Sequence, residues 1–83
     1  MSKFHKSLEV FLRHPTPREA TRAEVEQALT HLHFQLQSHK GSHYRWRHAD
    51  GARITYALIG GRKAGVTTVE DIATEIRRRR LGE

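Results

Sequence analysis

The residue types that can do chemistry gather around one histidine, His43, near the middle of the 83-residue chain. An imidazole titrates near neutral pH, so it can act as a general base or a general acid. Small polar residues and cations stand close to it in sequence, namely Lys40, Gly41, Ser42, Arg45, Arg47 and Arg53. Lysine and arginine attract phosphate, arginine through a bidentate fork, and glycine lets a ligand approach the backbone. The pattern would suit proton transfer by His43 beside a bound phosphate group, and the alternative is an ordinary exposed histidine.

The basic charge of the chain is concentrated in the same region. The whole sequence has 15 Lys and Arg against 9 Asp and Glu, for a formal net charge of +6. Residues 39–63 contain six of the cations and one acid, Asp50, so this segment holds nearly all of the excess. Such a segment is typical of a surface that binds phosphate groups, above all those of a nucleic acid. The alternative interpretation is a solvated charged face.

Several other kinds of site are excluded or disfavoured. The chain contains no cysteine, which excludes disulfides, thiolate nucleophiles and cysteine zinc sites. His31 and His33 do not face each other on a helix, so we expect no metal site and no cofactor. The longest apolar run, 56–59, is too short to cross a bilayer, and the first residues lack the apolar core of a signal peptide. We therefore expect a cytoplasmic protein with no membrane partner.

Two amphipathic helices are expected in the first half of the chain. Apolar residues spaced as on one helical face predict a helix over 4–13, which Pro15 and Pro17 end. A second helix is expected over about 22–33, because Thr21 and Glu24 have the spacing of a capping box. Its buried face is predicted to consist of Val25, Ala28, Leu29 and Leu32.

The periodicity then changes to that of strands. Strands are predicted over about 34–39, 43–48 and 53–59, the last two joined by an Asp50-Gly51 hairpin turn. A glycine-rich basic loop, 60–65, precedes a closing helix whose predicted N-cap is Thr67 or Thr68 and whose predicted C-cap is Gly82.

These elements predict an α+β fold. The order is α-β-β-β-α with an extra N-terminal helix, and the three strands form an antiparallel meander. Both main helices cover one face of this sheet in a two-layer sandwich. We expect residues 1–17 to form a helical extension and linker, and residues 18–83 to form the domain.

Alternation along the strands assigns side chains to the two faces of the sheet. The face toward the helices is predicted to contain Phe34, Leu36, Tyr44, Trp46, Ile54, Tyr56 and Leu58. The opposite face is predicted to contain Gln35, Gln37, His39, His43, Arg45, Arg47, Arg53 and Thr55. A shift of one residue would bury three arginines, which excludes the reverse assignment. His39 is then a candidate for a second acid or base beside His43, and the other histidines are expected to have no catalytic role.

With Lys40-Gly41-Ser42-His43 between two strands, the sequence resembles the HicA-type toxins, small bacterial enzymes that cleave mRNA. The similarity covers about residues 21–80. It includes the helix before Phe34, the Arg47-His48-Ala49-Asp50-Gly51 hairpin, the Arg53-Ile54-Thr55 strand and the closing helix.

The resemblance implies a fold like that of double-stranded RNA-binding domains, with His43 as the catalytic residue. It also implies a metal-independent endoribonuclease that a HicB-type antitoxin neutralises. Lys40, Gly41, Ser42, Arg45, Arg47 and Arg53 are then the candidate RNA-binding residues, and the isolated chain is expected to be a monomer.

Two other functions stay open from the sequence. Many HicA-type toxins have a Pro-x-His sequence at the end of the third strand, where this chain has Ala57-Leu58-Ile59. This difference favours a non-catalytic RNA-binding module of the same fold. The second alternative is a protein that engages an antitoxin without binding RNA. Salt-dependent RNA binding separates these two alternatives, and RNA cleavage separates both from the toxin.

Overall fold

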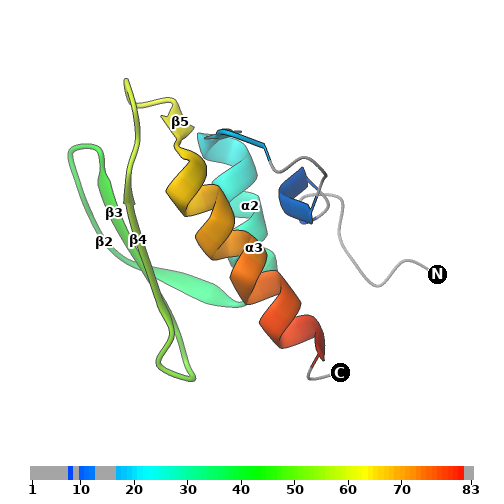
Figure 1. Ribbon diagram of the computed structural model, residues 1–83. Helices are drawn as coiled ribbons and strands as arrows, with labels where there is room; N and C mark the ends of the chain where they lie inside the picture. The colour runs from blue at the N-terminus through cyan, green and yellow to red at the C-terminus, as the bar shows by residue number, and fades with distance from the viewer. Residues whose placement is uncertain (1–7, 9, 13–16, 82–83) are drawn as a thin grey trace.

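The structure, a computed structural model, describes residues 8, 10–12 and 17–81. Its elements are η1 (Val10–Leu12), β1 (Ala20–Thr21), α2 (Arg22–His31), β2 (Phe34–Lys40), β3 (His43–His48), β4 (Arg53–Ala57), β5 (Lys63–Ala64) and α3 (Val66–Leu81). Strands β2, β3 and β4 form an antiparallel sheet in that order. Helices α2 and α3 both lie on one side of this sheet (Figure 1). The α+β arrangement of two helices on a three-stranded antiparallel sheet is confirmed.

Helix α2 begins with the predicted capping box. The Thr21 hydroxyl accepts a hydrogen bond from the Glu24 amide at 3.2 Å, and the Glu24 carboxylate accepts one from the Thr21 amide at 2.8 Å. The helix ends at His31 with Leu32 as its C-cap, two residues before the predicted end. The reason is that His33 has left the helical conformation, with φ at 70°.

Helix α3 begins earlier than predicted. Its first residue is Val66, and the Val69 amide donates to the Gly65 carbonyl at 3.1 Å, so Gly65 accepts a bond that closes the first turn. Thr67 and Thr68 therefore lie inside the first turn, and the prediction that one of them caps the helix is wrong. The predicted C-cap, Gly82, lies outside the described residues.

A second, two-stranded sheet joins the starts of the two helices. Strand β1 pairs with β5, with Ala20 opposite Ala64 and Thr21 opposite Lys63. The Arg22 amide also donates to the Arg62 carbonyl at 2.9 Å. Because α2 and α3 each follow one of these strands, the pairing holds their N-terminal ends side by side (Figure 1). The sequence predicted only a loop over 60–65.

The third strand of the main sheet is shorter than predicted. It ends at Ala57 rather than at residue 59, because Ile59 pairs with Lys63 in the turn that leads into β5. The Ile59 amide donates to the Lys63 carbonyl at 2.7 Å.

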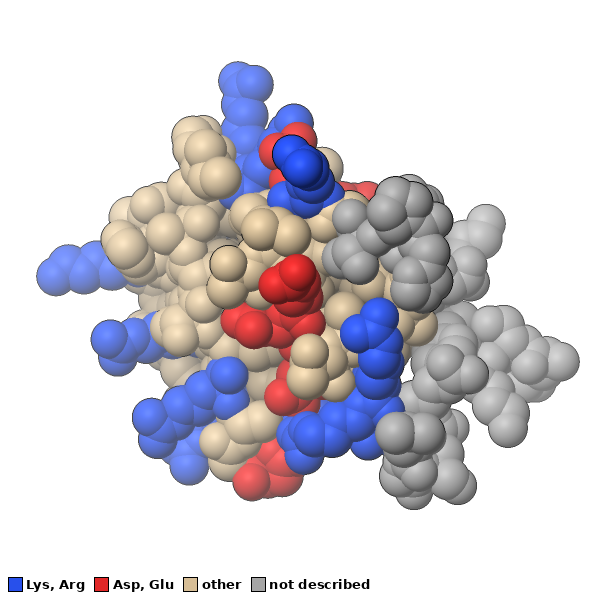
Figure 2. All heavy atoms as spheres, in the orientation of Figure 1, with Lys and Arg blue, Asp and Glu red and all other residues tan. Residues whose placement is uncertain are grey.

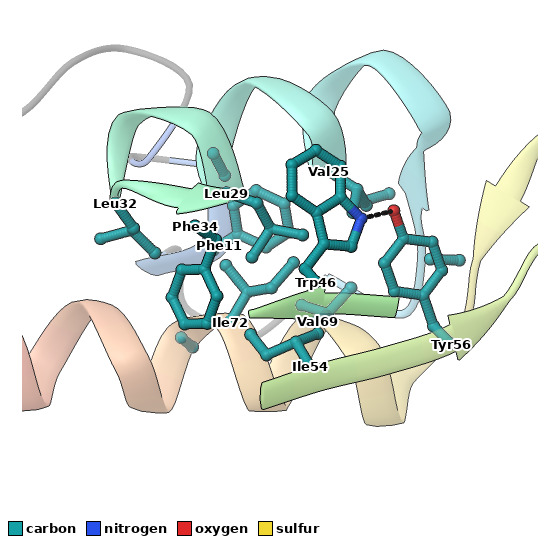
Figure 3. Close-up of a cluster of buried hydrophobic side chains, with 14 of the residues drawn as sticks. Phe11, Val25, Leu29, Leu32, Phe34, Trp46, Ile54, Tyr56, Val69 and Ile72 are labelled. Atoms are coloured by element: carbon teal, nitrogen blue, oxygen red, sulfur yellow. Dashed lines mark hydrogen bonds between the residues drawn. The ribbon is translucent and has the colours of Figure 1, made fainter. Parts of the chain in front are cut away.

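The core fills the space between the helices and the sheet (Figure 3). Val25 and Leu29 of α2 and Ile72 of α3 are fully buried, and they meet apolar side chains from all three strands. A polar pair also lies in this core: the Trp46 indole N–H donates to the Tyr56 hydroxyl at 2.9 Å. Burial raises the pKa of Tyr56 to about 12.

The extra N-terminal helix predicted over 4–13 lies mostly outside the described residues. The described part forms the short 3-10 helix η1, which packs against α3. Leu8 and Phe11 are buried in the same core as the main helices, and Phe11 is 0% exposed. The division between residues 1–17 and 18–83 stays a prediction, for which Phe11 offers a test.

Candidate nucleic-acid interface

The side of the main sheet away from the helices, called here the open face, is basic. On β3, His43, Arg45 and Arg47 are exposed whereas Tyr44 and Trp46 are buried. Strand β4 continues the alternation, with Arg53 and Thr55 exposed and Ile54 and Tyr56 buried. The assignment of these two strands to their faces is therefore confirmed. Lys and Arg side chains project along the side of the molecule where the sheet lies (Figure 2).

A β-bulge changes the assignment of strand β2. The pairing with β3 shifts between Leu36 and Ser38, so an extra residue enters the strand there. Beyond the shift, Ser38 pairs with Arg45, His39 with Tyr44 and Lys40 with His43. Ser38 and Lys40 thus belong to the open face.

His39 lies on the opposite side of the sheet from His43, so its predicted place beside the catalytic candidate is wrong. Its ring stacks on Tyr44, with centroids 4.3 Å apart and planes at 10°. Its Nε2 lies 2.7 Å from the Gly41 carbonyl oxygen, which can only accept, so Nε2 donates this bond. The bulge is the cause, because one inserted residue reverses the face of every side chain that follows.

The prediction that Leu36 belongs to the core is also wrong. Leu36 lies opposite the buried Trp46, yet it is 45% exposed. Strand β2 is an outer strand of the sheet, and α2 passes into it directly, so only Phe34 at its start is covered.

His43 lines an open hollow in this face. The hollow is lined by Ser38, Lys40, His43, Arg45, Thr55, Tyr56 and Ala57. The His43 side chain is exposed, and its imidazole forms no hydrogen bond with any residue that the structure describes. Both of its nitrogens are therefore open to a ligand, with Lys40 opposite on the neighbouring strand and Arg45 two residues along β3. This arrangement can hold a phosphate group next to a proton donor or acceptor.

Gly41 and Ser42 form the turn that precedes His43. Lys40 and His43 are directly opposite each other, so the two residues between them form a two-residue hairpin loop. Gly41 has φ at 61°, the value that the first position of a type II′ turn requires. The Ser42 carbonyl accepts a hydrogen bond from the Leu58 amide at 2.9 Å, which ties the turn to the residue after β4. These two residues thus fix the position of His43, and neither lines its hollow.

Two arginines of the open face lie directly opposite each other. Arg47 of β3 pairs with Arg53 of β4, and both side chains are exposed. They line a second hollow that shares Arg45 and Thr55 with the first. Like charges in directly opposed positions repel each other, and an anion between them removes the repulsion. The pair is therefore arranged to favour an anionic ligand.

Among the residues that the structure describes, no carboxylate is paired with a cation of this face. Between Glu26 and Glu70 the sequence has one acid, Asp50, in the hairpin between β3 and β4. Its Oδ2 accepts from Arg79 of α3 at 2.9 Å, and its Oδ1 accepts from the Ala52 amide at 2.9 Å. The Arg79 bond, aided by the Ala52 amide, holds the pKa of the Asp50 carboxyl well below its usual range. Asp50 is thus engaged on the helix side, and the cations of the open face are left for a ligand.

The sequence interpretation missed Arg79 and His48. Arg79 lies in an Arg77–Arg80 run that reads as a solvated helix end, but its side chain is only 18% exposed. It donates to Glu75 at 3.1 Å as well as to Asp50, and its guanidinium lies 5.1 Å from the centre of the Phe34 ring. The His48 Nε2 lies 3.1 Å from the same guanidinium. This cluster attaches the β3–β4 hairpin to α3, and no local pattern reveals it because Asp50 and Arg79 are 29 residues apart.

Acid is expected to weaken this attachment. An Asp carboxyl in an unfolded chain titrates near pH 4. Because folding lowers the pKa of Asp50, its ionised form stabilises the fold above about pH 4, and this contribution is lost as the pH falls further. We expect the midpoint of thermal unfolding to fall more steeply between about pH 4 and pH 2 in the native chain than in Asp50→Asn. A constant difference between the unfolding midpoints of the two chains over this pH range would contradict the bond between Asp50 and Arg79.

In the described part of the chain, no helix is long and apolar enough to span a bilayer. Nor do three His, Asp or Glu side chains of the described residues gather where they could hold a metal ion. Comparison with protein-family models, with curated protein sequences and with solved structures finds no match for this chain.

Proposed function

We propose that the protein binds the sugar-phosphate backbone of RNA on its open face and that His43 catalyses cleavage of this RNA. The observation that carries the proposal is the hollow in which His43 lies together with Lys40 and Arg45. Two further arginines, Arg47 and Arg53, extend the positive surface along the same face. A polyanion with evenly spaced charges fits this row of cations better than a small acidic metabolite does.

The reaction that suits one imidazole and several cations is internal transesterification of RNA. A base removes the proton of the ribose 2′-hydroxyl, and this oxygen attacks the adjacent phosphorus. The bond from phosphorus to the 5′-oxygen breaks, and the leaving oxygen takes up a proton. The products are a 2′,3′-cyclic phosphate and a 5′-hydroxyl. His43 serves as the base or as the acid, solvent supplies the other proton transfer, and Lys40 and Arg45 stabilise the charge that develops on phosphate.

This chemistry distinguishes RNA from DNA. DNA lacks the 2′-hydroxyl nucleophile, so the open face would bind single-stranded DNA through its phosphates and leave it intact. Within a cell the proposed substrate is mRNA in the cytoplasm, and the protein acts there as a toxin. Its resemblance to the HicA-type toxins adds a HicB-type antitoxin to the proposal, as a partner that neutralises the protein by covering the basic face.

A second function is a non-catalytic RNA-binding module, and one observation favours it. The bulge turns His39 to the other side of the sheet, so His43 is the one imidazole among the residues that line its hollow. A nuclease that uses two imidazoles would lack its second group here. Binding without cleavage is then the expected behaviour, and cleavage assays on the native chain separate the two functions.

RNA binding is expected to depend on salt in proportion to the phosphates that the open face neutralises. For a single strand, the plot of log Kobs against log salt has a slope of about −0.7 per phosphate contact. Lys40, Arg45, Arg47 and Arg53 together predict a slope of about −2.8. Arg45→Gln is expected to reduce its magnitude by about 0.7 and to weaken binding about 5- to 10-fold at low salt. A labelled 2′-O-methyl oligouridylate, which lacks the nucleophile, allows the measurement without cleavage.

The matched control is Arg77→Gln. It removes the same charge from an exposed position on α3, on the helix side of the molecule. We expect this variant to bind as the native chain does. Equal losses in the two variants would assign the affinity to net charge alone and would overturn the open face as the binding surface.

A further inference from the structure

The residue that joins α2 to β2 has an unusual backbone conformation. His33 has φ at 70°, and it is the one residue other than glycine with a positive φ in the described part of the chain. A residue with a Cβ is strained in this left-handed conformation, which glycine adopts freely. Glycine is therefore expected to make the fold more stable at this position than histidine does. Strain of this kind is a reason to examine what the side chain meets.

The His33 side chain lines a third hollow of the molecule. The hollow is formed by His33, Gln35, Gln37, Arg47, His48 and Ala49. It shares Gln37 and Arg47 with the hollow of the opposed arginines, which in turn shares Arg45 and Thr55 with the hollow of His43. The three hollows thus follow one another along the open face, with His43 at one end and His33 at the other.

We infer that His33 and Arg47 form a second phosphate-binding subsite for the RNA strand that His43 cleaves. The inference rests on the proposed function and adds the length and strandedness of its substrate. Strand β3 advances about 17 Å from His43 to His48, a distance that several nucleotides of one RNA strand span. The ligand is therefore a single strand of several nucleotides that lies along β3.

The charges around His33 determine how this subsite depends on pH. Arg47 and His48 face it from β3, and Gln35 and Gln37 face it from β2. On the far side of His48, the guanidinium of Arg79 of α3 is bound to Asp50, so this carboxylate is not free to pair with His33. Acid protonates imidazole side chains, and a protonated His33 is a second cation beside Arg47. A phosphate between them is then held more tightly.

The test measures affinity and stability in the same variants. The probe is a labelled 2′-O-methyl decauridylate, titrated at pH 5.5 and at pH 7.5 into the native chain, His33→Gly and His33→Asn. Asparagine tolerates the left-handed conformation but does not titrate, so His33→Asn keeps the fold and removes only the charge. His39→Asn is the matched control, because it removes an exposed imidazole on the other side of the sheet.

We expect both His33 variants to bind at least threefold more weakly than the native chain at pH 5.5 and nearly equally at pH 7.5. His39→Asn should keep the native gain in affinity at pH 5.5. At the same time, His33→Gly should raise the midpoint of thermal unfolding by about 2–6 °C, because it removes the strain. A weaker binder that is more stable cannot be explained by damage to the fold.

The two proposals fail in different ways. If both His33 variants bind as the native chain does at both pH values while Arg45→Gln binds weakly, the second subsite is overturned and the RNA-binding face stands. If Arg45→Gln also binds as the native chain does, the proposed function itself is overturned, and the subsite with it.

Discussion

Replacing His43 by alanine is expected to slow RNA cleavage by about 10²- to 10⁴-fold, the usual contribution of a general acid or base. The side chain is exposed on β3, so its removal opens no cavity and leaves the cations of the open face in place. RNA binding should therefore change little while cleavage is lost. In bacteria, induced expression of the native chain should stop growth with loss of mRNA, and His43→Ala should not.

The measurement is growth after induction, with total RNA sampled over time and the amount of folded protein checked for each variant. His39→Ala is the control, because it removes a histidine of the same β2–β3 hairpin whose ring points to the other side of the sheet. Arrest by the native chain and by His39→Ala, but not by His43→Ala, is the expected pattern. Equal growth of all three, with each protein folded and intact RNA, would refute cleavage and leave the RNA-binding module.

Replacing Phe11 by alanine is expected to lower the free energy of unfolding by about 3–5 kcal/mol. Phe11 is 0% exposed in η1, which packs against α3, and it is among the largest fully buried side chains of the described residues. The total stability of an 83-residue chain is about 4–12 kcal/mol. The expected loss is thus a large part of the total, and urea denaturation with and without the substitution measures it.

The outcome also decides how the chain is divided. Leu36→Ala is the control, since Leu36 is a large apolar side chain that is 45% exposed, and its truncation should cost less than about 1 kcal/mol. If Phe11→Ala lowers the free energy of unfolding no more than Leu36→Ala does, residues 1–17 form an extension beside an independent domain, as the sequence predicts. If it costs the expected amount, the residues around Phe11 are part of the folded unit, and a chain cut at residue 18 would expose apolar surface on α3.

Features that depend on neighbouring residues could be predicted from the sequence. The Thr21 and Glu24 capping box is a local pair of hydrogen bonds, so its spacing is sufficient to place the start of α2. The alternation of Tyr44 and Trp46 with arginines likewise assigns the two faces of β3, because no regular register buries the arginines at acceptable cost. The cations around His43 follow directly from this assignment.

Features that depend on distant parts of the chain could not be predicted from the sequence. The pairing of Thr21 with Lys63 needs the two helix starts to be brought together, which no local pattern encodes. The bond from Arg79 to Asp50 joins residues 29 positions apart. The bulge after Leu36 is a single inserted residue that leaves no mark in the alternation, yet it exchanges the faces of His39 and Lys40. The left-handed conformation of His33 could not be predicted either, because no local sequence pattern indicated it.

The bulge in β2 has a consequence for the protein at high concentration. The outer side of β2 pairs with no other strand of the described residues, so its backbone N–H and C=O groups offer a template on which a second chain could add. Because the pairing shifts after Leu36, only Phe34–Leu36 keep a regular register before the interruption. A stretch of three residues is too short to support stable strand addition, and the irregular backbone that follows does not match a straight partner. The inserted residue is therefore expected to disfavour the addition of a second chain along β2.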